Sequence, residues 1–88
     1  MKKLFKANIE EYKKMSGKEL IIDKKGNGKI YKLGTDILLF EGKFLNGKKN
    51  GKGKEYYNNK KLKSEGEYLK GKMLKGKYFN KKVKLFLN

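Results

Sequence analysis

The fold is decided by one stretch of sequence, Phe40-Glu41-Gly42-Lys43-Phe44-Leu45-Asn46-Gly47-Lys48. Its pattern returns 24 residues later in Glu65-Gly66-Glu67-Tyr68-Leu69-Lys70-Gly71-Lys72. The stretch after the first copy, Gly51-Lys52-Gly53-Lys54-Glu55-Tyr56, has an upstream relative in Gly26-Asn27-Gly28-Lys29-Ile30-Tyr31. Self-similarity at a fixed short period indicates a repeat architecture. Two well-formed units and fragments of two others are therefore expected within residues 20–80.

Each unit is expected to form two short strands joined by a turn. Asn46-Gly47 and Asn50-Gly51 accept the positive φ of tight turns, and Asn58-Asn59 serves similarly between units. Short connections make neighbouring strands pair antiparallel. The prediction is an all-β fold, a single-layer antiparallel β-meander. Its strands are expected near residues 19–23, 28–33, 37–45, 51–57, 61–69, 74–79 and 82–87.

The alternation of side chains along a strand separates the two faces of this sheet. Phe40, Gly42 and Phe44 fall on one face of their strand. A glycine between large neighbours predicts that an aromatic ring from an adjacent strand lies across the bare backbone. The residues expected to build the repeat in this way are Phe40, Gly42, Phe44, Gly47, Gly51, Gly53, Gly66, Tyr68 and Gly71.

The segment before the repeats is expected to be helical over residues 5–16. Phe5, Ile9 and Tyr12 recur at helical spacing, Asn8 is a suitable cap and Gly17 a suitable stop. The alternative for this segment is a basic arm without fixed structure. The expected organisation is a helical segment over residues 1–17 and a meander over residues 18–88, together making one domain.

The composition is dominated by lysine. The formal net charge is +16, and all 25 basic residues are Lys. Such a field attracts phosphates and anionic membranes, but the absence of Arg removes the residue best suited to bidentate phosphate and guanine contacts. The chain has no Cys, and its apolar runs are too short to span a bilayer. The expected location is therefore the cytoplasm.

The residue types for common catalytic chemistry are missing from this sequence. The chain contains no His and no Cys, which excludes the usual general base, the thiol nucleophile and the usual transition-metal ligands. Asp23 and Asp36 do not form a metal-binding loop pattern. We expect a protein that is not an enzyme and that uses no cofactor.

The repeated residues resemble MORN repeats, whose pattern is aromatic-Glu-Gly-x-aromatic, then Asn-Gly-Lys, then Gly-x-Gly. Residues 40–53 meet nearly every position, and residues 51–62 are similar to the bacterial MORN variant found in small antitoxin-like proteins. Ser64 departs from the pattern where an aromatic leads the motif, and Lys60 departs where glycine is frequent. The resemblance implies a curled single-layer sheet used for dimerisation, protein docking or lipid association.

Two function classes stay open from the sequence. The first is a non-catalytic interaction module that binds a partner protein of acidic character, or a second copy of itself, through an open sheet. The alternative is a binder of an anionic ligand, which can be a nucleotide, nucleic acid or acidic lipid. The candidate binding residues are Lys48, Lys52, Lys54, Tyr56 and Lys72.

Overall fold

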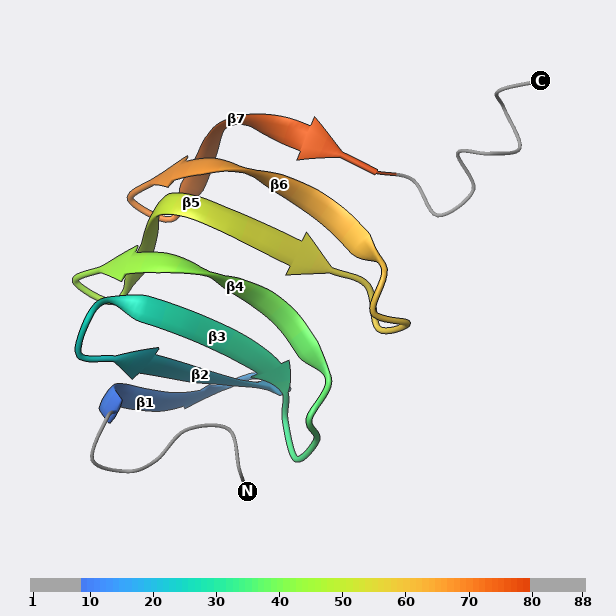
Figure 1. Cartoon of the computed structure of the whole chain (residues 1–88). Coiled ribbons are helices and arrows are strands. Elements are labelled where there is room, and N and C mark those ends of the chain that lie inside the picture. The colour runs from blue at the N-terminus through green and yellow to red at the C-terminus, as the bar shows by residue number, and fades with distance from the viewer. Residues whose placement is uncertain (1–8, 80–88) are drawn as a thin grey trace.

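The computed structural model describes residues 9–79, which form one open sheet of seven strands. The strands stand in sequence order, and each pairs antiparallel with the next (Figure 1). The predicted all-β hairpin meander is confirmed. The strands are β1 (Ile9–Met15), β2 (Lys18–Asp23), β3 (Asn27–Lys32), β4 (Leu38–Leu45), β5 (Lys48–Tyr56), β6 (Leu62–Leu69) and β7 (Lys72–Tyr78).

The N-terminal helix is the main correction to the predicted fold. Residues 9–15 form β1, which pairs with β2 from Ile9 opposite Asp23 to Met15 opposite Lys18. Gly17 has a φ of 70°, and this conformation suits the hairpin turn between β1 and β2 as well as it suits a helix stop. An isolated helix of about 12 residues is marginal in water, so hydrogen bonding to β2 as a strand is the more stable arrangement. Residues 5–8 and the strand expected at 82–87 lie outside the described residues.

The other strand predictions agree with the structure to within a few residues, but one predicted turn does not. Asn50 and Gly51 lie inside β5, where the register shifts and Gly51 takes a φ of 109°. The positive φ between β5 and β6 falls on Lys60, at 75°. Lys60 is also the residue that replaces the frequent glycine of the repeat pattern. No helix within residues 9–79 is long and apolar enough to cross a membrane.

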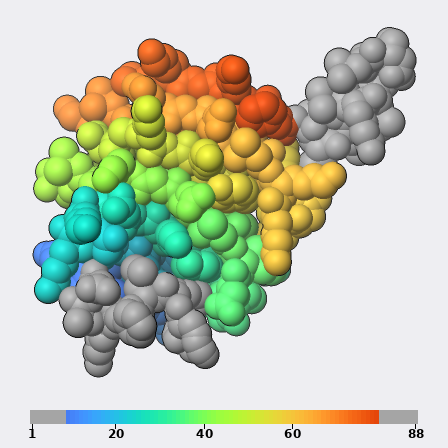
Figure 2. Space-filling model, in the orientation of Figure 1, coloured from blue at the N-terminus to red at the C-terminus, as the bar shows by residue number. Residues whose placement is uncertain are grey.

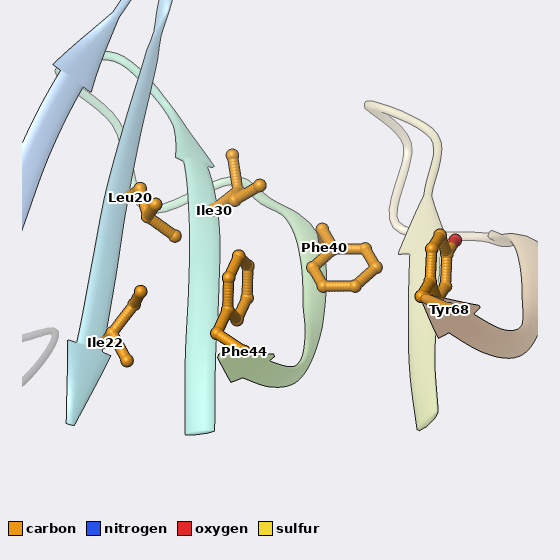
Figure 3. Close-up of a cluster of buried hydrophobic side chains, with 6 residues drawn as sticks. All are labelled: Leu20, Ile22, Ile30, Phe40, Phe44 and Tyr68. Atoms are coloured by element: carbon orange, nitrogen blue, oxygen red, sulfur yellow. The ribbon is translucent and has the colours of Figure 1, made fainter. Parts of the chain in front are cut away.

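The hydrophobic core lies on one face of the sheet, called here the inner face. Its buried members come from four strands, and Phe40 is only 1% exposed. Figure 3 shows these side chains gathered into one cluster. Phe40 packs edge-to-face against both Phe44 and Tyr68, with ring centroids 5.8 and 5.4 Å away. The six core residues are Leu20, Ile22, Ile30, Phe40, Phe44 and Tyr68.

A single-layer sheet buries such residues only by curling around them. The strands are visibly bent in Figure 1, and Figure 2 shows the side chains of β3 to β7 packed in successive bands. In line with this curl, the Glu11 carboxylate in β1 lies 3.7 Å from the position of a Cβ atom at Gly47, in the turn after β4. The curled sheet therefore covers its own core residues without a second layer.

A column of glycines crosses the sheet from β3 to β7. Each glycine lies opposite the next in register, one per strand from β3 to β7: Gly28, Gly42, Gly53, Gly66 and Gly76. The predicted ring across bare backbone is present at two of them. A Cβ at Gly28 would collide with the Phe44 ring, and one at Gly53 would lie 2.5 Å from Cζ of Phe40.

The column differs from the prediction at Gly42 and Gly66. A Cβ at Gly42 would lie 2.5 Å from the Lys52 carbonyl oxygen and 2.6 Å from the Gly53 Cα. A Cβ at Gly66 would strike the Lys75 carbonyl oxygen. At these two positions the close neighbour is therefore the backbone of the next strand, which has less freedom to move than a ring.

Candidate functional site

Three of the predicted binding residues lie together on β5. Lys52, Lys54 and Tyr56 alternate with Gly53 and Glu55, so they share the face opposite the core, called here the outer face. Both lysines are exposed and Tyr56 is partly buried. The strand register therefore places these three side chains on one face, as predicted.

Tyr56 has a partner within the sheet. Its hydroxyl donates a 2.6 Å hydrogen bond to Oε2 of Glu41 on β4. Burial, together with this bond and the charge of Glu41, raises the pKa of Tyr56 to about 12. The phenol therefore stays neutral at physiological pH and fixes β5 against β4 from the outer side.

Lys48 and Lys72 lie away from that group, at equivalent turns of the two repeats. Lys48 follows the Asn46-Gly47 turn and pairs with Leu45, and Lys72 follows Lys70-Gly71 and pairs with Leu69. The two turns are neighbours, because the Gly71 amide donates to the Lys49 carbonyl over 2.9 Å. Both lysines are exposed.

The outer face carries alternating rows of charge rather than a uniformly basic patch. Lys54 lies opposite Glu41 on one side and Glu65 on the other. Lys52 lies opposite Glu67. Between these rows, a hollow of about 460 Å³ covers the glycines of β5, β6 and β7. Each glutamate there offsets part of the field of the neighbouring lysines, and solvent screens the remainder.

A second hollow, of about 380 Å³, contains basic residues that the sequence did not indicate. It is bounded by Lys18 from β2, Lys49 from β5 and Lys63 from β6, with Glu55 as its only carboxylate within residues 9–79. Phe40 and Tyr57 contribute aromatic surface to its lining, Tyr56 borders it, and Asn58 and Asn59 contribute amides. We call this site the basic hollow.

Lys49 is the most confined of these cations. Its ammonium nitrogen lies 4.1 Å from the centroid of the Phe40 ring and 5.4 Å from that of Tyr68, within the range of cation–π attraction. Burial lowers the pKa of Lys49; Glu55 acts in the opposite direction, and the charges of Lys18 and Lys63 lower it further. The three lysines therefore act on one another through a partly desolvated space.

Glu55 and Ser64 link the hollow to the repeat. Ser64 is completely buried and donates a 2.8 Å hydrogen bond to Oε1 of Glu55. The other oxygen of Glu55 lies 3.9 Å from the Lys63 ammonium. Ser64 is the second-unit counterpart of Phe40 in the 24-residue repeat. In the sequence, the replacement of the aromatic residue by Ser64 was the signal that the inner face is unusual at this position.

The described residues contain no group of three or more carboxylates that could hold a metal ion. Comparison with known proteins gives no match: no family model, no curated protein and no solved structure matches the chain. The MORN resemblance therefore depends on the repeated residues themselves.

Proposed function

We propose that the chain is a non-catalytic MORN-type interaction module that binds an acidic partner protein by strand addition at β7. The observation that carries this proposal is that one side of β7 has no partner strand within the described residues. Within residues 9–79, β7 is the last strand of the sheet and pairs on one side only, with β6. An edge strand presents backbone donors and acceptors that an extended segment can use.

The charge pattern supports an acidic segment as the occupant. Lys77 lies opposite Glu65 and Lys75 opposite Glu67, so β6 already shows which strand complements β7. A strand with two glutamates in the same spacing would extend this alternation on the other side. Each cross-strand pair of opposite charges contributes about 0.2–1 kcal/mol. The net charge of +16 accelerates encounter with an acidic protein.

Apolar contacts add to this edge. Leu74 is 65% exposed and Tyr78 is 70% exposed, both from β7. An incoming strand can cover them while its carboxylates meet the lysines. Symmetric pairing of β7 with β7 of a second copy is unfavourable, because lysines would face lysines. Strand β1 of another copy is a poorer match, because its adjacent Glu10 and Glu11 are balanced by Lys13 and Lys14.

A peptide that copies residues 62–69 provides the test, because it contains Glu65 and Glu67 in the required spacing. Fluorescence anisotropy with the full chain should show binding that is lost when both glutamates of the peptide become lysine. The double variant K75E/K77E should also lose binding. K52E/K54E changes the same number of charges on the outer face of an interior strand, so it is the matched control and should keep most of the binding.

Equal losses for the two double variants would reject strand addition and leave only diffuse charge attraction. Light scattering then identifies the occupant. A mass of 10.3 kDa at all concentrations excludes a second copy as the occupant, whereas growth of the mass with concentration shows self-association. The other function class, binding of an anionic ligand, is favoured by the basic hollow.

A further inference from the structure

We propose that the basic hollow, formed by Lys18, Lys49 and Lys63 with the Lys49 ammonium over the Phe40 ring, binds a small dianion of the phosphate-monoester class. The site lies on the inner side of the sheet and uses none of the lysines that meet the acidic strand at β7. It is therefore a second binding function, independent of the one proposed for the edge.

The charge of the hollow is the first argument. Three ammonium groups share it with one carboxylate. Glu55 is already engaged by the Ser64 hydroxyl and by Lys63. The lysines that remain repel one another, and a dianion placed between them would remove that repulsion. Because the space is partly desolvated, attraction there is stronger than between the exposed charges of the outer face.

The confinement of Lys49 is the second argument. Its ammonium group is held over Phe40 and close to Tyr68, both members of the hydrophobic core. The position of this charge is therefore set by the folded sheet, unlike that of a surface lysine on a flexible stem. A preorganised cation loses little freedom when it binds an anion.

The size and lining of the hollow indicate the ligand class. Its volume of about 380 Å³ falls at the lower end of the range of roughly 300–1,000 Å³ for small-molecule sites. Lysine ammonium groups bind phosphate as point charges, and the amides of Asn58 and Asn59 add further hydrogen-bonding groups to the lining. Tyr57 offers an aromatic ring for the organic part of an ester, with the Lys63 ammonium 5.7 Å from its centroid. A long nucleic-acid strand needs an extended groove, so a compact monoester suits this hollow better.

Titration calorimetry with inorganic phosphate and with phenyl phosphate, at constant ionic strength, tests the site on the full chain. Both probes should bind saturably with one site per chain, and the ester should bind more tightly because its ring adds contacts. Lys49→Met keeps a long apolar stem over Phe40 and should weaken binding at least tenfold. Lys18→Met, at an exposed position, should weaken it severalfold with no effect on folding.

Two further variants separate a built site from diffuse attraction. Lys54→Met removes the same charge from the larger outer hollow and should change the affinity less than twofold. Glu55→Gln removes the competing carboxylate, keeps an acceptor for Ser64, and should strengthen binding. Equal losses in Lys49→Met and Lys54→Met, or weaker binding in Glu55→Gln, would overturn the proposal. Saturable binding of a single-stranded oligonucleotide but of neither small probe would also overturn it, because the ligand would then be a polyanion.

Discussion

The packing of Phe40 across Gly53 makes a quantitative prediction about Gly53→Ala. The new Cβ would lie 2.5 Å from Cζ and 2.9 Å from Cε1 of Phe40, and 3.1 Å from Cε1 of Tyr68. All three atoms belong to core rings that pack edge-to-face. The rings must therefore move apart for the methyl group to fit, and the centre of the core loses contact.

The expected magnitude follows from two opposing effects. Overpacking of this kind costs about 1–3 kcal/mol. Alanine also restricts the unfolded chain, which returns about 0.4–1 kcal/mol. We expect a net loss of about 1–2 kcal/mol in the free energy of unfolding, a large share of the roughly 4–13 kcal/mol typical of a domain of this length. Urea unfolding followed by far-UV circular dichroism, at fixed salt, measures this loss.

A double-mutant cycle with Phe40→Leu tests the cause of the loss. Leucine removes the ring edge that the new methyl group meets, so the double variant should lose less than the sum of the single variants, by at least about 0.5 kcal/mol. Gly66→Ala is the control, because the obstacle there is the backbone of β7. Its effect should add to that of Phe40→Leu. Additivity at Gly53 as well would refute the account of a ring lying across glycine.

Three further predictions concern other contacts. Because the pKa of Tyr56 is raised from 10.0 to about 12, the stability contributed by this phenol should be present below pH 10 and lost as the pH rises to about 12. In a titration followed by tyrosinate absorbance, Tyr56→Phe should remove the phenol that ionises at the highest pH. Ser64→Ala should cost about 1.5–3 kcal/mol in urea unfolding, because the lost hydroxyl donates to a charged acceptor, whereas alanine at the exposed Ser16 should change stability by less than about 0.5 kcal/mol. Lys60→Gly should raise stability by about 1 kcal/mol, because it relieves a positive φ, whereas Lys61→Gly should give no such gain in the same assay.

The repeat made most of the sheet predictable, because its signals are local. Asn46-Gly47 marks a two-residue turn, and alternation around Gly42 assigns Phe40 and Phe44 to one face. These features depend only on neighbouring residues. They can therefore be predicted without knowledge of the tertiary structure, and the strand register on both sides of β5 agrees with them.

The N-terminal segment and the basic hollow were not predictable by the same reasoning. Ile9, Tyr12 and Met15 fit a helical stripe, but whether they form a helix depends on the free edge of β2, which local spacing does not reveal. Lys49 shares the inner face with Gly53 and Glu55 by simple alternation, but its place opposite Phe44 depends on two extra residues of β5 between the partners of Gly42 and Phe44. The spacing of residues around Lys49 does not reveal a bulge of this kind, so it could not place the Lys49 ammonium over the Phe40 ring.

The strict neighbour-to-neighbour order of the strands also governs how the protein comes apart. Each strand gains its pairing energy from the one before it and the one after it, so the sheet behaves as a one-dimensional series of coupled links. A terminal hairpin can open while the remainder stays closed, and amide exchange then proceeds inward from the ends. Breaking the link between β4 and β5 instead divides the molecule into two short sheets and separates Phe40 from Tyr68. The centre of the series therefore sets the barrier to global unfolding, and its two ends set the rate of local opening.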